Sequence, residues 1–224
     1  MLIRSGINET ARQNLVSFSR GAALEYLGEL VGVSRLPASG ALCTIQFQLV
    51  EGHNGVTIPE ELRVQSMDGQ VIFQTVESKI IPTGTNTASI LCTCTTPGAI
   101  GNSYDINTIN IILDHQAFIS TAMNTEITSG GADEETDDEL RERIKLAPAS
   151  FSVAGPIDAY KFFAKSAHSS IVDVAVTSPV PGQVNIYPLL DGGVLPSAEI
   201  LDAVQVICNA DKIRPLTDTV ITDA

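Results

Sequence analysis

The sequence predicts an α+β protein with an N-terminal helix, a small antiparallel β-sandwich or barrel domain, a helical linker pair and a C-terminal β-β-α-β module. The first observation behind this prediction is that the hydrophobic spacing changes along the 224-residue chain from a helical period to strict alternation and back. The second is that Val, Ile and Thr make up roughly a quarter of the residues, an enrichment that pleated sheets favour. The expected parts are residues 1–35, 36–130, 131–168 and 169–224, the last incomplete at its C-terminal end.

The first segment, residues 8–31, has the apolar spacing of one long amphipathic helix. Its stripe advances by steps of three or four residues and contains Ile7, Ala11, Leu15, Phe18 and Ala22. Two glycines weaken the helix and mark a possible break into two, Gly21 and Gly28. Because no second helix follows nearby, the stripe is expected to pack either on a remote part of this chain or on another chain.

Residues 40–129 read as strands. Residues 43–49 alternate between apolar and polar side chains, as in a half-buried strand. Asp68-Gly69 lies between two apolar runs and predicts a hairpin, since both residues tolerate positive φ. Further strands are expected at residues 62–67, 70–76, 88–96, 108–113 and 118–127. Four cysteines without metal-ligand spacing are expected to be buried, unbridged thiols of a reducing compartment: Cys43, Cys92, Cys94 and Cys208.

Residues 131–224 are predicted to contain both helices and strands. Thr136 and Glu139 have capping-box spacing, and two i,i+4 ion pairs are expected in the helix that follows, Asp137–Arg141 and Glu139–Arg143. A second helix should open at Gly155-Pro156. The module after it is expected to contain strands at 171–177 and 184–190, a helix at 196–209 and a strand at 219–222.

The charge balance argues against several partners. The chain has 13 Lys and Arg against 26 Asp and Glu, a formal net charge of −13. Nucleic-acid binding needs clustered basic residues, and an anionic membrane surface would repel this chain. No run approaches the 18 apolar residues of a membrane span, and residues 1–14 lack the apolar core of a signal peptide.

The densest charge lies at residues 133–139, which hold six carboxylates. The alternating pattern and central glycine of a calcium loop are absent from this run. The carboxylates are therefore expected either to complement the positive end of the following helix dipole or to contact a basic partner chain.

Catalytic motifs are missing. The three histidines, His53, His115 and His168, stand apart from one another and from the cysteines, so solvated or capping roles are expected for them. No serine or threonine has a readable activating His and Asp, and nucleotide-binding glycine motifs do not occur. The sequence predicts no enzyme, no metal and no cofactor.

Several strings together resemble the baseplate J-like family of contractile-tailed bacteriophages. They occur in the family's order over most of the chain: ALEYLGELVGVSRLPA at 23–38, PGAIGN at 97–102, GGADEETDDELRERIKLAPASFSVAGPIDAY at 130–160, VAVTSPVP at 174–181 and IRPLTDTV at 213–220. The resemblance implies a structural protein of the baseplate wedge that joins neighbouring wedges into a ring. It implies a virion protein made in the host cytoplasm, with other wedge proteins and further copies of itself as partners. Family members generally extend beyond both ends of this sequence, which is what a truncated prophage gene or an expressed fragment would give.

The interface candidates follow from the stripe and the acidic run. They are Leu15, Phe18, Ala22, Tyr26, Glu134, Glu135 and Asp138. An alternative from another class is a β-sandwich surface-binding or adhesin-like module. That alternative predicts exposed aromatic residues clustered on one face.

Overall fold

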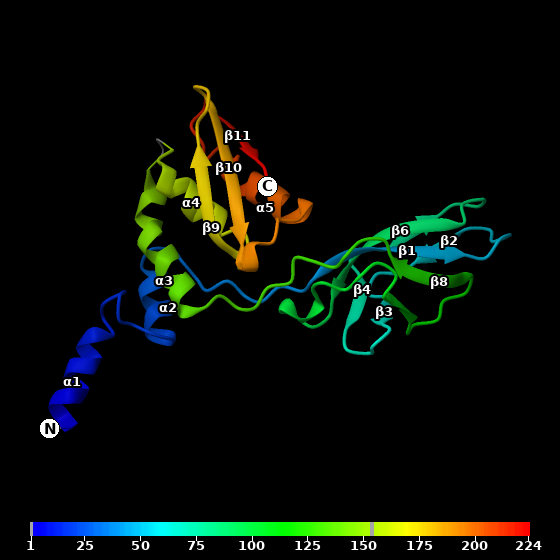
Figure 1. The fold of residues 1–224 in the computed structure, drawn as a ribbon, viewed down its shortest axis with the longest axis horizontal. Helices are drawn as coiled ribbons and strands as arrows, with labels where there is room; N and C mark the ends of the chain where they lie inside the picture. Colours follow the sequence, from blue (N-terminus) through cyan, green and yellow to red (C-terminus); the bar gives the residue numbers. More distant parts are fainter. Residues whose placement is uncertain (1, 153–154) are drawn as a thin grey trace. The chain divides into compact units, whose positions relative to one another are not determined.

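The computed structural model describes residues 2–152 and 155–224, and their side chains from Gly6 onward. Two compact units form, one from residues 1–37 and 134–224 and the other from residues 38–133 (Figure 1). The second unit is thus inserted between two segments of the first. The α+β class is confirmed, whereas the division into four parts stays a prediction.

The inserted unit is a nearly closed antiparallel barrel. Six strands follow in the order β7-β3-β4-β6-β1-β8. Their bounds are β1 Leu42–Leu49, β3 Arg63–Ser66, β4 Ile72–Thr75, β6 Thr87–Cys94, β7 Ile109–Ile112 and β8 Ile119–Asn124. A separate two-stranded ribbon, β2 Val56–Ile58 with β5 Lys79–Ile81, was not predicted. The alternation predicted for residues 43–49 holds, because Cys43, Ile45, Phe47 and Leu49 are all buried.

Asn124 closes the barrel between its two outermost strands. Its side-chain oxygen accepts the Ile109 N–H at 2.9 Å, and its backbone carbonyl accepts the Asn107 N–H at 3.1 Å. Its side-chain amide donates to the carbonyls of Asp105 and Glu126. Since Asn124 is fully buried, these bonds satisfy a polar group inside an apolar environment. They also explain why β8 ends at Asn124, although the prediction extended it to residue 127.

The predicted hairpin at Asp68-Gly69 is confirmed. It joins β3 to β4, and Gly69 has φ 74°, a value at which a side chain is strained. The Asp68 carboxylate accepts the Ser66 hydroxyl at 2.5 Å and the Gln70 N–H at 3.0 Å. These hydrogen bonds, with the Ser66 hydroxyl as the largest cause, lower the pKa of Asp68.

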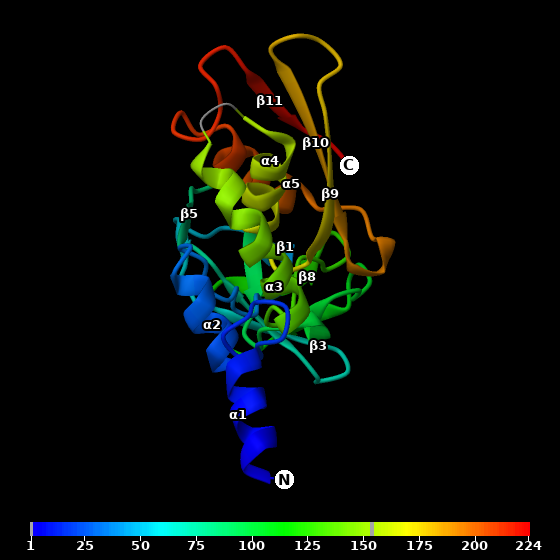
Figure 2. The ribbon, with the colours of Figure 1, turned by 90° about the vertical axis from the view of Figure 1, so that its left-hand side faces the viewer.

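The other unit joins helices to a small mixed sheet. Its helices are α1 Leu2–Arg12, α2 Ala22–Glu29, α3 Asp137–Leu146, α4 Ile157–Lys165 and α5 Ala198–Cys208. Its strands are β9 Ile171–Thr177, β10 Gln183–Leu190 and β11 Thr219–Thr222. β10 pairs antiparallel with β9 and parallel with β11, and the elements follow the predicted β-β-α-β order. Figure 2 shows α4 and α5 beside this sheet, and their buried side chains, such as Tyr160 and Val204, share one core with it.

The single helix predicted for residues 8–31 is wrong, although the break at Gly21 was foreseen. α1 ends at Arg12, and residues 13–21 form turns before α2 begins. Polar side chains bind the backbone in this stretch, since Asn14 donates to the Thr10 carbonyl and Gln13 accepts the Arg20 N–H. Such local bonds compete with helix continuation, and Gly21 then adopts φ 52°.

Part of the N-terminal segment packs on a remote part of the chain. Leu24 of α2 is fully buried with Leu140 and Ile144 of α3 in a small separate core. Gly28 allows this approach, because a Cβ there would lie 2.7 Å from the Val33 carbonyl oxygen and 3.2 Å from Ile144 Cδ1. Leu24 lies outside the predicted stripe, whose residues Ile7, Ala11, Leu15, Phe18 and Ala22 are all exposed, so packing of the stripe itself stays a prediction.

Burial of the four cysteines without disulfide bonds is confirmed within the described residues, whereas the reducing compartment stays a prediction. All four thiols are free and buried. Burial raises the pKa of Cys92 and of Cys208 to about 12, so both stay protonated near neutral pH. Among the helices that the structure describes, none is both long and apolar enough to cross a membrane.

Candidate functional site

The histidines have structural surroundings. His53 is buried, and its Nδ1 accepts the Gly55 N–H at 3.2 Å, so Nε2–H donates to the Thr85 carbonyl at 2.9 Å. His168 contacts the Ser170 hydroxyl at 2.7 Å. His115 is exposed. Across the described residues, His, Cys, Asp and Glu side chains do not gather into a group of three or more that could hold a metal ion.

The main assembly of charged groups surrounds α3, where a buried ion pair forms. Arg143 donates from Nε to Glu135 Oε1 at 2.5 Å and from Nη2 to Oε2 at 2.7 Å. Arg143 also donates to the Ser34 carbonyl and the Ser166 hydroxyl, and Glu135 accepts the Leu36 N–H. Both side chains are at most 5% exposed. This bidentate pair joins three segments that are far apart in the sequence.

A second arginine joins α2 to the start of α3. Arg35 donates to Glu25 Oε1 at 2.8 Å, to Asp137 Oδ1 at 2.6 Å and to the Glu135 carbonyl at 2.6 Å. The Gly21 N–H donates to the other oxygen of Asp137. The hydrogen bond from Gly21, followed by that from Arg35, lowers the pKa of Asp137.

A third arginine holds the turns between α1 and α2 against α3. Arg141 donates to the carbonyls of Val16 and Ser19, both at 3.0 Å, and pairs with the Asp138 carboxylate. Val16 turns inward against the small core. Residues 16–19 are thus fixed to α3, whereas α1 extends beyond them (Figure 1).

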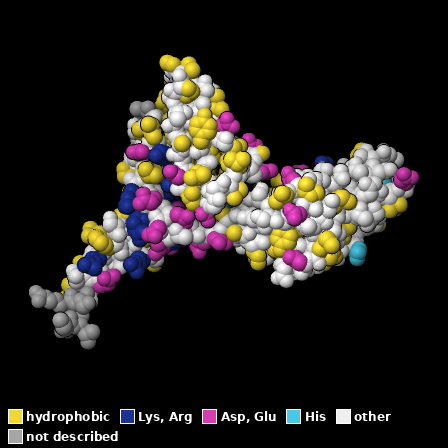
Figure 3. Space-filling model, viewed as in Figure 1, with side chains coloured by type: hydrophobic (Ala, Val, Ile, Leu, Met, Phe, Trp, Pro, Cys, Tyr) yellow, Lys and Arg dark blue, Asp and Glu magenta, His cyan; other side chains and the backbone are white. Residues whose placement is uncertain are grey.

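The four predicted apolar candidates all lie on the surface. Leu15 is 54%, Phe18 53% and Tyr26 67% exposed, and Ala22 is exposed as well. The Arg12 guanidinium lies 5.7 Å from the centre of the Phe18 ring, within cation–π range. Figure 3 shows Lys, Arg, Asp and Glu side chains interleaved on the surface in the region of α2 and α3. We call Leu15, Phe18, Ala22 and Tyr26 the N-terminal apolar surface.

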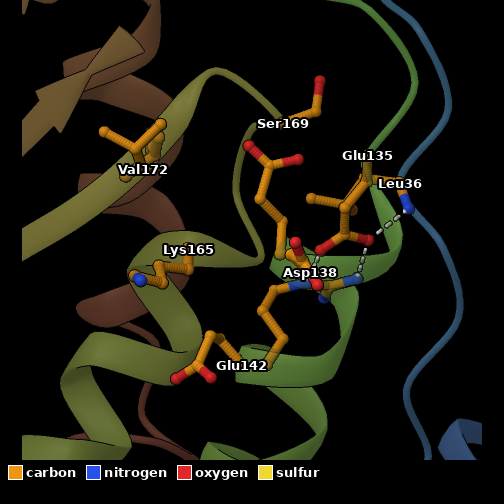
Figure 4. Close-up of a pocket in the computed structure, with 10 residues that line it drawn as sticks. Leu36, Glu135, Asp138, Glu142, Lys165, Ser169 and Val172 are labelled. Carbon is orange, nitrogen blue, oxygen red and sulfur yellow. Dashed lines mark hydrogen bonds and ion pairs between the residues drawn. The ribbon is translucent and has the colours of Figure 1, made fainter. Parts of the chain in front are cut away.

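The acidic candidates separate into two kinds. Glu134 and Asp138 are exposed, and the Asp138 side chain is 93% accessible. Glu135 is instead buried in the pair with Arg143, so its carboxylate is not on the surface, and the proposal that it contacts a partner is corrected (Figure 4). The hollow beside it has a volume of about 180 Å³ and is lined by Glu142, Lys165 and Val172, among others. That volume is below the roughly 300–1,000 Å³ of small-molecule sites.

The capping box is confirmed, but the two i,i+4 ion pairs are wrong. The Glu139 carboxylate accepts the Thr136 backbone N–H at 2.8 Å, and the Thr136 hydroxyl accepts the Glu139 backbone N–H at 3.4 Å. Asp137 pairs with Arg35 instead of Arg141, and Arg143 pairs with Glu135. Sequence reasoning missed Arg143 as a buried group. Its position between Leu140 and Ile144, on the apolar face of α3, was the signal that could have found it.

Thr136→Ala should lower the free energy of unfolding of the helical unit by about 1 kcal/mol, because it removes the N-cap acceptor of α3. Urea unfolding followed through the amide exchange of α3 would measure the change. Thr136→Ser keeps the hydroxyl and should unfold like the parent. Equal losses in both variants would contradict the capping role.

Comparisons with known proteins match both units. The model of the baseplate J-like protein barrel domain matches residues 44–131, and the model of the baseplate J-like central domain matches residues 152–224. Both models describe baseplate J-like domains, and they match consecutive stretches of the chain. The chain belongs to the baseplate J-like family.

Two individual proteins are similar to this chain. Baseplate protein J of Escherichia phage P2 is 32% identical over 123 residues, a stretch covering 54% of this chain and 40% of the relative. The chain thus spans less than half the length of that relative. The second is a chain in the cryo-EM structure of the anti-feeding prophage baseplate, 6-fold symmetrised. The alignment covers 88% of this chain and 60% of that chain, with 14% sequence identity and a TM-score of 0.44.

Proposed function

We propose that this chain is a structural component of a phage or related contractile-system baseplate and acts through protein–protein contacts without enzymatic activity. The observation that carries the proposal is the match of the barrel and central-domain models in sequence order. The dispersed histidines and buried, protonated thiols agree with a structural role.

The N-terminal apolar surface is the proposed contact with helices of other wedge proteins. Three large apolar side chains there are more than half exposed, and fixing residues 16–19 to α3 keeps Phe18 in place. Contiguous exposed apolar patches that are rimmed by polar residues are typical of interaction sites. Glu134 and Asp138 would meet basic groups of the partner. Copies of this chain would join neighbouring wedges into the ring.

The adhesin-like alternative gains no support from the aromatic residues of the barrel. Phe47 and Phe73 are buried in its core, and Tyr104 packs against that core. Phe118 is exposed, but a single exposed aromatic residue within residues 38–133 does not form the cluster that this alternative predicts.

The double variant Leu15→Asp/Phe18→Asp should remain folded and lose binding to its wedge partners. Both side chains are half exposed, so folding changes little, while two buried interface carboxylates would weaken binding by about 30-fold or more. Co-purification from cells expressing the complete baseplate gene cluster would measure the effect. The matched control is Val194→Asp/Leu195→Asp, which places the same charges on another exposed apolar pair.

Equal binding by the double variant and the parent would contradict the N-terminal contact. Loss of binding in the control variant as well would show that charge alone disrupts assembly, and would contradict the assignment to this surface. Absence of the chain from purified tail particles would contradict the baseplate role itself.

A further inference from the structure

Phe118, at the start of β8, has an unfavourable backbone conformation for an aromatic residue. Its φ is 71°, in the left-handed region. Elsewhere in the described residues, positive φ without glycine occurs at Glu61, Ser103 and Asn107, none of which is aromatic. A bulky side chain in this region is a genuine outlier and stores backbone strain. Glycine or asparagine would adopt the same turn with less strain.

The Phe118 side chain is also exposed, to 52%. Its carbonyl accepts the Val50 N–H at 2.9 Å, so it lies beside Val50, which is 50% exposed. The neighbouring Ile119 packs against the barrel core, and the Ser120 hydroxyl donates to the Gln48 carbonyl at 2.9 Å. The fold therefore fixes the backbone of Phe118 and of the two residues that follow it without covering the Phe118 ring.

The unit that carries this apolar pair has a negative net charge. Residues 38–133 contain nine Asp and Glu against two Lys and Arg, a net charge of 2 − 9 = −7. Glu51 adjoins Val50 and has no ion pair among the described residues. Arg63 is bound through two nitrogens to Asp114, at 2.9 and 2.7 Å, and these hydrogen bonds lower the pKa of Asp114 to about 2. Lys79 donates to the Ser89 carbonyl.

We propose that Phe118, with Val50 beside it, anchors a protein partner that has a basic surface around an apolar recess. Interface energy concentrates in a few buried aromatic residues, and complementary charge at the rim selects the partner. At this site the barrel of a second copy is disfavoured as the partner, because it carries the same net charge of −7; the proposed contacts between copies in the ring lie elsewhere on the chain. The inference rests on the proposed baseplate role and adds to it a contact on the barrel, separate from the N-terminal apolar surface.

Photo-crosslinking in assembled tail particles tests this directly. Residue 118 is replaced by the photoreactive phenylalanine analogue p-benzoylphenylalanine in the full chain, and the matched control carries the same analogue at Met67, another exposed barrel residue. After irradiation, mass spectrometry identifies the adduct. The expected result is one adduct at residue 118, joined to a partner peptide flanked by Lys or Arg, and a weaker or different adduct at residue 67.

Two substitutions distinguish the effect of the Phe118 ring on assembly from the effect of its strained backbone on stability. Phe118→Asn suits left-handed backbone, so it should raise the thermal midpoint, yet it should reduce incorporation into particles about 30-fold. Phe118→Tyr keeps the ring and the strain and should assemble like the parent.

The outcomes distinguish this inference from the proposed function. Particles that contain the chain but give no adduct at residue 118, or an adduct to another copy of the chain, overturn the inference and leave the baseplate role standing. Normal assembly of Phe118→Asn also overturns it. Absence of the chain from the particles overturns both.

Discussion

Phe47→Ala should lower the free energy of unfolding of the barrel by about 3–5 kcal/mol. Phe47 is fully buried in β1, opposite Ala88 of β6 on one side and Ala122 of β8 on the other. Two small neighbours leave the aromatic ring to fill the centre of the barrel. Since alanine neighbours cannot extend into the space that truncation opens, the cavity should persist and the loss should lie at the upper end of this range. Ile45→Ala, on the same buried face, should cost about 2–5 kcal/mol.

Hydrogen exchange of β1 and β6 amides across a urea series would report the barrel separately from the helical unit. Gln48→Ala is the matched control, because Gln48 is the exposed residue next to Phe47 on the same strand. The control should unfold within about 0.5 kcal/mol of the parent. A similar result for Phe47→Ala would mean that the strand register is wrong.

The barrel was predictable because its signal is local. Alternation along residues 43–49 specifies which face is buried, and Asp68-Gly69 specifies a turn through two neighbouring residues. The ribbon of β2 and β5 escaped prediction because each strand has three residues, too few for a period to be recognised. The closure by Asn124 depends on a hydrogen bond to Ile109, which no local pattern encodes.

The candidate site was less predictable because its charged side chains form ion pairs with residues far away in the sequence. Sequence spacing offered Asp137 a partner four residues away, but Arg35 reaches it across 102 positions. Burial decides the outcome, since Arg35 and Arg143 are largely desolvated and each needs several acceptors. The exposed candidates, Leu15 and Phe18, were found because apolar residues without a packing partner are visible in the sequence itself.

Arg143→Met should destabilise the helical unit by about 3–5 kcal/mol, because it leaves the Glu135 carboxylate buried without its counterion. Arginine and methionine side chains have similar lengths, so the loss of stability would come mainly from the uncompensated Glu135 charge and not from a cavity. Glu135→Gln in the same chain should recover part of the loss, since a neutral amide can still accept the Leu36 N–H.

A double-mutant cycle on Arg143→Met and Glu135→Gln, followed by amide exchange of α3 in urea, would measure the coupling between the two groups. Lys145→Met is the control on the same helix, where the side chain is 47% exposed and its ion pair with Glu142 should contribute less than about 1 kcal/mol. If Arg143→Met cost no more than this control, the pair would not hold residues 34–36 against α3. If instead the double variant lost the sum of the two single losses, the carboxylate and the guanidinium would be acting independently, contrary to their bidentate geometry.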